Sequence, residues 1–339
     1  MSQITGLTSG RYVRHWLDLM SRRGYSVAEL FSGTGLDIKQ FDNPPSYLSQ
    51  LQVERIFENA LKMTNNQYLG IEFGMNLNFA AHGPLGFAGL TARTVLEAQE
   101  QMVRYMPLVT SLVRLAQTKD VASNSSVVQV LPQPGISPIT ANILTQTVLS
   151  SVYVMTRFLL GEHADIRICW TQEPSDYITN AFKHPSTTTL FNHTENSFGI
   201  PISLVDTPVV LADEHARQQA IASCESEMRE LEKHTTLSHR IHRQLLDNSN
   251  GMPSIEQIAK QLHLSTRTVH RRLQEEGTCF RDLANSVRMT LAKQYLIYDG
   301  FSVTEVAYRL GYGDSANFTR AFKRAEKLTP TEYLQQNKR

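Results

Sequence analysis

The sequence predicts two domains of different fold class: an α+β domain over residues 1–206 and an all-α domain over residues 236–339. In the second range, apolar residues recur at helical spacing behind good helix N-caps. The first range mixes helical patterns with short runs of β-branched and aromatic residues. A chain of 339 residues is long enough for two complete cores, and residues 207–235 are expected to form a linker or dimerisation helix.

Helical patterns open the N-terminal domain, over Arg11–Arg22, Val27–Phe31 and Gln50–Met63. Thr94 and Glu97 have the spacing of a capping box and start a further helix. Pro107 must interrupt or kink that helix, which is then expected to resume to about Gln117.

The rest of this domain is predicted to combine one long helix with short strands. Ser137 and Pro138 start the helix, which runs to Gly161. β-Branched and aromatic residues cluster between turn signals in four runs, which we expect to form antiparallel strands: Val127–Leu131, Ile166–Trp170, Thr187–Phe191 and Phe198–Val205.

The junction between the domains, Asp213–His234, is predicted to be a helix with one apolar stripe. The stripe consists of Ile221, Cys224, Met228 and Leu231, at 3-4-3 spacing. Two heptads do not decide between its two uses. The stripe can pair with a second copy of the chain, or it can pack against the chain's own N-terminal domain.

The C-terminal domain contains one pattern twice, which predicts two tandem helix-turn-helix units. In the first copy, Ser254 and Gln257 form a capping box that opens a short helix. His263 lies in the turn, and Ser265 caps a second helix, Thr266–Glu276.

The second copy has the same order of signals. Ser302 and Glu305 form the capping box, Gly311 supplies the turn, and a second helix runs from about Ser315 to Ala325. In each copy the second helix has an apolar stripe and an opposite side rich in residues that bind phosphates and base edges.

A long helix, Arg281–Tyr298, separates the two copies. Its roughly 18 residues span about 27 Å at the rise of an α-helix. That length is close to the ~34 Å between successive major-groove faces of a DNA duplex. The spacing therefore predicts that both units bind one side of the same duplex.

The C-terminal pattern resembles a known family. The run from Phe301 to Tyr333, FSVTEVAYRLGYGDSANFTRAFKRAEKLTPTEY, resembles the signature of the AraC/XylS family of bacterial transcription regulators, and the resemblance extends over Leu237–Tyr333. The N-terminal half resembles the ligand-responsive, arabinose-binding-like domain of one branch of that family. That match lies on HGPLGFAGLTARTVLEA, His82–Ala98, and on Pro174–Val205. The label does not make arabinose the ligand.

The resemblance implies which residues contact DNA. Base contacts are expected from Arg267, His270, Arg271, Ser315, Asn317 and Arg320, and backbone contacts from Thr319 and Lys323. His263 departs from the family pattern, in which glycine is common in the first turn. Because histidine adopts positive φ at a cost, this turn is expected to be strained or of another type.

Charge is distributed unevenly between the two halves. The net charge of the chain is +1, but residues 236–339 hold 16 Lys and Arg against 10 Asp and Glu, and the remainder holds 17 against 22. The basic half fits a nucleic-acid partner, with binding that weakens steeply as salt rises. The acidic half is not expected to wrap DNA.

A small-molecule pocket in the N-terminal domain would need apolar walls and a few well-placed polar groups. The candidate partners for a ligand carboxylate are Arg93, Arg104 and Arg157. The candidate walls are the segment Phe79–Phe87 and side chains of two helices: Met102, Tyr105, Met106, Tyr153, Met155 and Phe158. The alternative is that these residues are ordinary core and surface.

Patterns that carry catalysis or metal binding are weak. Gly83, Gly86 and Gly89 are spaced GxxGxxG, which is not the dinucleotide motif and favours tight packing. The histidines and carboxylates that invite a metal site lie on one polar helical stretch, which favours a solvated face: Glu227, Glu230, His234, His239 and His242. We expect no catalytic residue, no metal and no cofactor.

The cysteine and hydropathy patterns are those of a reduced, cytoplasmic protein. Cys169, Cys224 and Cys279 have no pairing or CxxC spacing, although Cys169 or Cys224 could act as a redox sensor. No signal peptide is recognised at the start. The most apolar stretch, Ile143–Leu160, is interrupted by polar residues and is not expected to cross a membrane.

Together these patterns predict a sequence-specific transcription regulator, an activator, controlled by a small molecule bound to the N-terminal domain. The expected partners are double-stranded DNA, the effector, a second copy of the chain and, by the family resemblance, RNA polymerase. Two alternatives stay open. The N-terminal domain could only dimerise, or it could be an enzyme fused to a DNA-binding module.

Overall fold

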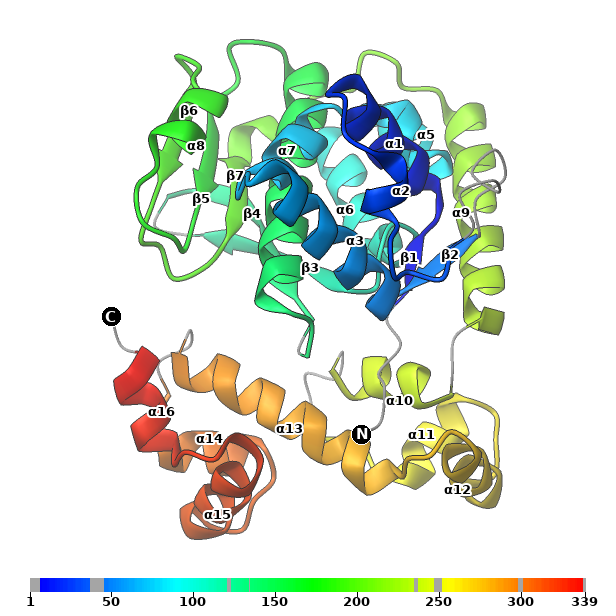
Figure 1. Cartoon of the computed structure of the whole chain (residues 1–339), viewed down its shortest axis with the longest axis vertical. Helices are drawn as coiled ribbons and strands as arrows, with labels where there is room; N and C mark the ends of the chain where they lie inside the picture. Colours follow the sequence, from blue (N-terminus) through cyan, green and yellow to red (C-terminus); the bar gives the residue numbers. More distant parts are fainter. Residues whose placement is uncertain are drawn as a thin grey trace. The chain divides into compact units, whose positions relative to one another are not determined.

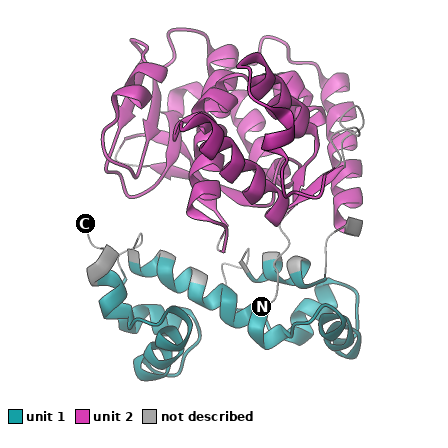
Figure 2. Ribbon diagram, in the orientation of Figure 1, with its two compact units in different colours: residues 1–4, 233–339 teal, residues 5–232 magenta. Residues whose placement is uncertain are grey.

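The computed structural model describes residues 7–36, 46–120, 123–133, 135–234, 237–246, 252–297 and 301–337. The chain forms two compact units that divide between Glu232 and Lys233 (Figure 2). The N-terminal unit therefore extends past the expected boundary at residue 206 and includes most of the junction helix. Its fold is α+β, and the described part of the C-terminal unit is helical (Figure 1).

The N-terminal unit contains helices, short 3-10 turns and two sheets. The helices are α1 (Arg11–Arg22), α2 (Val27–Leu30), α3 (Gln50–Thr64), α4 (Leu69–Met75), α5 (Pro84–Leu90), α6 (Val95–Tyr105), α7 (Pro138–Leu160), α8 (Asp176–Ala181) and α9 (Glu214–His234). The strands are β1 (Leu7–Ser9), β2 (Tyr47–Ser49), β3 (Val113–Asp120), β4 (Ser125–Pro132), β5 (Ile166–Cys169), β6 (Thr187–Leu190) and β7 (Ser197–Pro201). The 3-10 turns are η2 (Phe79–His82), η3 (Met106–Leu108) and η4 (Ile202–Leu204).

The main sheet has the strand order β3-β4-β7-β5-β6, and β1 pairs with β2 in a separate ribbon. The expectation of antiparallel strands is wrong at one edge, because β5 and β6 run parallel. The chain returns from β5 to β6 through α8, and a helix is the usual connection between neighbouring parallel strands. The other pairs in the sheet are antiparallel.

The helix expected to resume after Pro107 is a strand instead. α6 ends at Tyr105, Pro107 lies in the turn η3, and β3 pairs with β4 along its whole length, from Val113 opposite Pro132 to Asp120 opposite Ser125. The start of β3 alternates between buried and half-buried residues, which is the period of a strand with one covered face.

The cap of α6 also differs from the expectation. The Thr94 hydroxyl accepts the backbone N–H of Glu97, as in a capping box. The Glu97 carboxylate, however, accepts the backbone N–H of Arg93 at 2.7 Å rather than that of Thr94. The start and end of α7 are as expected, with Ser137 as N-cap and Gly161 as C-cap.

α7 is the central helix of the N-terminal unit and packs closely against α4. Two glycines of α4 permit this approach. A Cβ atom on Gly74 would lie 2.4 Å from the carbonyl oxygen of Thr147, and one on Gly70 would lie 2.4 Å from that of Ile143. No side chain other than hydrogen fits at either position.

α7 is also long and apolar enough, by length and composition, to cross a membrane. More than half of its most apolar window is buried inside the protein, which is how the core helix of a globular domain behaves. Its buried residues face α3, α4 and the sheet.

α9 packs against the N-terminal unit through the predicted apolar stripe. Cys224 and Leu231 are buried there against Leu85, Tyr105 and Leu108. Ion pairs flank this contact, from Arg11 to Glu227 at 3.1 Å and from Arg104 to Glu225 at 3.0 Å. The stripe was expected either to pair with a second copy of the chain or to pack against the chain's own N-terminal domain. The structure shows the second arrangement.

The C-terminal unit contains α10 (Leu237–Leu246), α11 (Ile255–Gln261), α12 (Thr266–Glu275), α13 (Phe280–Ile297), α14 (Val303–Arg309), α15 (Ser315–Glu326) and α16 (Pro330–Asn337). The predicted capping boxes at Ser254 and Ser302 are present. Ser265 caps α12, and Asp314 caps α15 through the backbone N–H of Asn317. Tyr298, the expected end of the long helix, lies outside the described residues.

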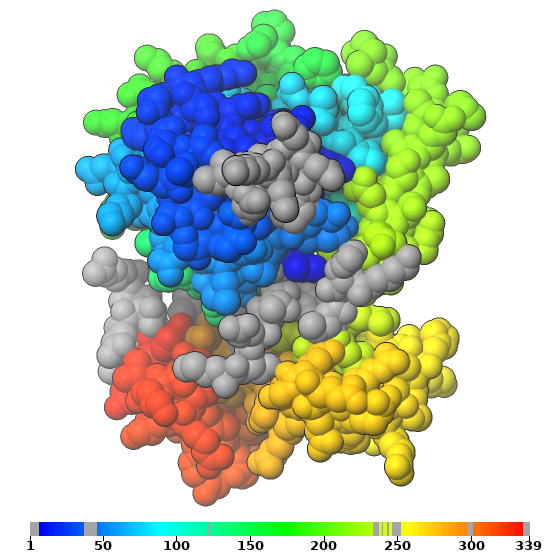
Figure 3. All heavy atoms as spheres, turned by 45° about the vertical axis from the view of Figure 1, so that its right-hand side comes forward, coloured from blue at the N-terminus to red at the C-terminus, as the bar shows by residue number. Residues whose placement is uncertain are grey.

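Two apolar clusters hold the helix pairs α11–α12 and α14–α15. Val269 and Leu273 are fully buried in the first cluster, and Phe318 and Phe322 are fully buried in the second. Leu291 of α13 packs against both clusters, so one helix joins them. The pairs lie at opposite ends of α13 (Figure 1) and form separate lobes of this unit, yellow and red in Figure 3.

The two turns differ as the sequence indicates. Gly311 has φ +77° between α14 and α15, a conformation that glycine adopts without strain. His263 has φ +54° in the corresponding turn between α11 and α12. The first turn is thus in the left-handed region, which costs a histidine free energy that a glycine would not lose.

The contact between α4 and α7 generates a prediction about stability. Gly74→Ala should lower the free energy of unfolding of the N-terminal unit by about 2 kcal/mol or more, because the new methyl group overlaps the α7 backbone. Urea unfolding followed by tryptophan fluorescence measures this, since both tryptophans, Trp16 and Trp170, lie in this unit.

Gly89→Ala is the matched control. A Cβ atom at Gly89 meets Phe79 Cε1 at 3.5 Å, an ordinary contact, and alanine favours the helix by up to about 1 kcal/mol. Equal losses in the two variants would contradict the proposed role of the close approach.

Candidate functional site

The second helix of each C-terminal pair presents a polar, mostly basic face to solvent. On α12, Arg267, His270 and Arg271 are exposed, while Val269 and Leu273 are buried beneath them. Arg271 donates to the Glu275 carboxylate at 2.7 Å. Since a base contact by Arg271 would replace this exposed ion pair, little free energy is lost in breaking it.

On α15 the predicted residues form a hydrogen-bonded row along the helix surface. Arg320 donates to the side-chain oxygen of Asn317 at 2.6 Å, and the Asn317 amide donates to Asp314 at 2.7 Å. Ser315 is half-buried, and Lys323 is exposed one turn beyond Arg320. The Thr319 hydroxyl donates to the Ser315 carbonyl at 2.8 Å, so its hydrogen is already used within the helix.

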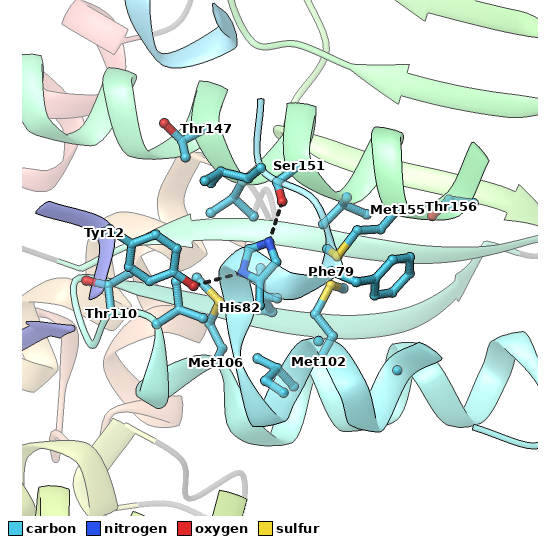
Figure 4. A pocket seen from close by; sticks show the side chains of 18 of the residues that line it. Tyr12, Phe79, His82, Met102, Met106, Thr110, Thr147, Ser151, Met155 and Thr156 are labelled. Atoms are coloured by element: carbon cyan, nitrogen blue, oxygen red, sulfur yellow. Dashed lines mark hydrogen bonds between the residues drawn. The ribbon is translucent and has the colours of Figure 1, made fainter. Parts of the chain in front are cut away.

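The N-terminal unit contains a cavity of about 110 Å³ (Figure 4). Side chains from α1, α3, α4, η2, α5, α6, β3 and α7 line it. Most of these are apolar or aromatic, including Trp16, Phe57 and Phe79, and methionines such as Met102 and Met155 reach in from α6 and α7. A mainly apolar space with a few polar groups is the usual character of a small-molecule site.

A chain of three hydrogen-bonding side chains crosses one side of this cavity. The Tyr12 hydroxyl lies 2.8 Å from Nδ1 of His82, and Nε2 of His82 lies 2.9 Å from the Ser151 hydroxyl (Figure 4). α1, η2 and α7 contribute one residue each, and all three residues are buried. This row of hydrogen-bonded side chains therefore joins three elements at the cavity wall.

All three groups are uncharged at neutral pH. Burial, with smaller effects of the nearby His15 and Arg11, lowers the pKa of His82 to about 4. Burial also raises the pKa of the Tyr12 hydroxyl well above its usual range. The His82 ring thus has one N–H donor and one acceptor nitrogen, which suits a neighbour on each side.

The sequence-predicted ligand residues are only partly brought together. Of the expected wall residues, Phe79, Met102, Met106 and Met155 line the cavity. Phe87, which is largely exposed, does not, and neither do Tyr153 and Phe158. Tyr105 is buried on the other side of α6, against α9, and its hydroxyl is 3.4 Å from Glu225.

The arginines proposed for a ligand carboxylate lie away from the cavity. Arg93 pairs with Glu97 on the surface and Arg104 pairs with Glu225 of α9. Arg157 donates to the carbonyl oxygens of Ala164 and Ser186 and so fixes the loop after α7. None of the three lines the cavity.

Sequence reasoning missed Tyr12, His82 and Ser151. Tyr12 and Ser151 read as ordinary helix residues, and nothing in the spacing connects positions 12, 82 and 151. A histidine inside an apolar segment beside Pro84 was the one available signal, because a histidine placed there needs partners for both ring nitrogens.

Two connections, one through packing and one through Arg11, join the cavity wall to α9. Leu85 and Val109 line the cavity and also belong to the apolar cluster beneath α9. The backbone carbonyl of His82 accepts a hydrogen bond from Arg11 at 2.9 Å, and the same guanidinium contacts Glu227 of α9. A shift of His82 would therefore move a group that holds α9.

The redox and metal alternatives receive no structural support from the described residues. Burial, reinforced by Glu227, raises the pKa of the Cys224 thiol to about 11, and burial raises that of Cys169. A reactive cysteine needs the opposite shift. Among the described residues no group of three or more His, Cys, Asp and Glu side chains could hold a metal ion. The side chains of His234 and His239 lie outside the description.

Comparison with known proteins gives two family matches. A model described as the N-terminal arabinose-binding domain of AraC transcription regulators matches residues 24–209, and one described as a helix-turn-helix domain matches residues 258–336. The chain is similar to an ornithine utilization regulator of Pseudomonas aeruginosa, with 28% identity over 324 residues, 95% of this chain and 94% of the relative.

Two further relatives match in different ways. The transcriptional activator RhaS of Salmonella arizonae is 40% identical over 81 residues, 24% of this chain and 29% of its own length. The crystal structure of the transcriptional regulator CdpR from Pseudomonas aeruginosa aligns with 96% of this chain and 98% of its own, at 22% identity and a TM-score of 0.49.

The buried His82 generates a prediction about pH. Its pKa is lower in the folded protein than in the unfolded chain, so the unfolded chain binds a proton that the folded protein does not. Its contribution to stability is complete above about pH 6.5 and is lost as the pH falls towards 4, by roughly 3 kcal/mol. Urea midpoints across this range, followed by tryptophan fluorescence, measure the loss.

His82→Gln keeps a polar side chain that does not titrate. Its midpoint should fall less over the same pH range, and the difference between the two curves isolates His82. Parallel curves would show that His82 is not the titrating group.

Proposed function

The chain belongs to the AraC family of DNA-binding transcription regulators, and on that premise we propose a function for each of its two units. The C-terminal unit binds one DNA duplex through two helix-turn-helix units. The N-terminal unit holds a small effector in the cavity beside His82. Occupancy of that cavity changes how readily the C-terminal unit binds DNA.

The observation that carries the first part is the pair of exposed helices α12 and α15 at the two ends of α13. Each has a fully buried apolar stripe and an exposed basic or amide face. The described length of α13, 18 residues, corresponds to about 27 Å. That span suits recognition helices placed in successive major grooves of one duplex.

Arg267, His270, Arg271, Ser315, Asn317 and Arg320 are the proposed base contacts, and Lys323 is a proposed backbone contact. Asn317 and Arg320 carry the side chains that pair with adenine and guanine edges. Thr319 is a weaker candidate for the backbone, because its hydroxyl already donates to Ser315 and can offer a phosphate no second hydrogen.

The contacts between the cavity and α9 support control by an effector. An effector that favours one position of His82, Leu85 or Val109 also favours one arrangement of α9, and α9 leads directly into the C-terminal unit. The effector shifts the equilibrium only by its difference in affinity for the two arrangements. The same reasoning favours a sensing N-terminal unit over one that only dimerises.

The remaining features of the proposal rest on the family. We propose an activator, because a relative that matches the DNA-binding region is described as one. By resemblance to this family we also propose dimerisation, contact with RNA polymerase and a cytoplasmic location. The relatives are described as regulators, which favours this function over an enzyme fused to a DNA-binding module.

Substitutions on α15 test the DNA-binding proposal. A preferred duplex is selected from a random-sequence library with the parent protein, and dissociation constants are measured for it and for its single-base variants. Arg320→Ala should weaken binding by about 1 to 3 kcal/mol and remove the preference at one position. Unchanged discrimination at every position would contradict a base contact.

Lys323→Ala is the matched comparison on the same helix. It removes a charge that faces the backbone, so binding should weaken equally for all sequences. The slope of log affinity against log salt should fall in magnitude by about one. A loss confined to one base pair would refute the assignment of Lys323 to the backbone.

A further inference from the structure

The cavity wall has no ionised side chain. No Asp, Glu, Lys or Arg is among the described residues that line it, and the lining histidine, His82, is neutral at physiological pH. A charged ligand enclosed there would lose its hydration without gaining a partner of opposite charge. That desolvation costs several kcal/mol for each ion.

The same wall does offer hydrogen-bond donors. Gln99 lines the cavity and is 5% exposed. Its side-chain oxygen accepts from Gln117 and Ser126, at 3.2 Å each, which fixes the orientation of the amide. Its amide nitrogen has no hydrogen-bond partner among the described residues. A buried, unpaired N–H is costly, so an acceptor supplied from outside the chain would stabilise this side chain of the cavity wall.

The row Tyr12–His82–Ser151 supplies a second donor. Its three groups carry three polar hydrogens when His82 is neutral, and the two hydrogen bonds in the row use two of them. If Tyr12 donates to His82, then His82 donates to Ser151 and the Ser151 hydrogen is left over. If the direction is reversed, the Tyr12 hydrogen is left over. Both tautomers of His82 therefore leave one hydroxyl hydrogen at the cavity wall.

The size of the cavity limits the ligand. At roughly 10 to 15 Å³ for each water-sized group, its volume of about 110 Å³ holds about ten non-hydrogen atoms. A sugar of that size would need a partner for each hydroxyl, which a wall composed mainly of apolar side chains does not provide.

We propose that the effector is an uncharged, mainly apolar molecule of about ten non-hydrogen atoms that carries a carbonyl-type oxygen. This oxygen accepts one hydrogen bond from Gln99 and another from the hydroxyl at one end of the Tyr12–His82–Ser151 row. This inference rests on the proposed effector function of the cavity. It sets the chain apart from a regulator whose effector is a charged amino acid, although a relative is described as an ornithine utilization regulator.

The experiment uses the full-length chain and a matched set of probes. Trp16 lines the cavity and the other tryptophan, Trp170, does not, so quenching or shift of Trp16 emission reports occupancy. Trp170→Phe removes the second emitter. The probes are 2-octanone, octylamine, octanoate, L-ornithine and L-arabinose. Calorimetry on the parent gives the same affinities without a substitution.

We expect 2-octanone to bind at least tenfold more tightly than octanoate or octylamine, and L-ornithine and L-arabinose to leave Trp16 emission unchanged. Gln99→Leu should lower the affinity for 2-octanone by about fivefold, because one hydrogen bond to the ligand is lost. Gln117→Leu is the control. It removes the structural hydrogen bond to Gln99 but keeps the amide N–H, so the affinity for 2-octanone should persist.

Tighter binding of octanoate, octylamine or L-ornithine than of 2-octanone would overturn the inference, and so would binding of none of the five. When a probe binds, Ala98→Leu separates a wrong ligand class from failure of the proposed function, because Ala98 lines the cavity and the larger side chain fills it. If a charged probe binds and Ala98→Leu abolishes its binding, the cavity remains the effector site and only the ligand class is wrong. If a probe binds equally to parent and Ala98→Leu, the cavity is not the site and both proposals fail.

Discussion

The approach of α4 to α7 is the constraint on which the N-terminal unit depends. Gly70 and Gly74 let the two helix backbones come together, and any larger residue would push them apart. α7 then contacts α3 and the main sheet, and it contributes Ser151 and Met155 to the cavity wall. The position of the cavity is therefore fixed by two residues that do not line it.

Much of the architecture follows from local patterns. Helical patterns locate α1 and α3 within a residue or two, and Ser137 and Pro138 locate the start of α7. The capped helix pairs of the C-terminal unit lie where the spacing places them. The failures have local causes. The prediction of a helix over β3 fails because Pro107 ends α6 and does not kink it, and Val113 and Leu115 alternate with partly covered neighbours as in a strand. α4 is short and contains two glycines, which hides its helical periodicity.

The cavity was harder to predict than the exposed helix face proposed to contact DNA. An exposed face is visible in the sequence, because residues on one helix keep a fixed spacing. A cavity is the space left between elements from distant parts of the chain, so Tyr12, His82 and Ser151 have no shared signal. Arg93 and Arg157 were candidate partners for a ligand carboxylate, and the structure places them in surface and loop contacts instead.

α13 constrains the relative rotation of the two helix pairs as well as the distance between them. It is a continuous helix over its described length, and Leu291 lies against the apolar clusters at both ends. If both helix pairs bind one duplex, as proposed above, such a rod fixes the rotation of one pair about the duplex axis relative to the other. Each added base pair turns the second DNA segment by roughly 35°, since a turn of DNA contains about 10 base pairs. A regulator built this way selects the helical phase of its two half-sites together with their sequence.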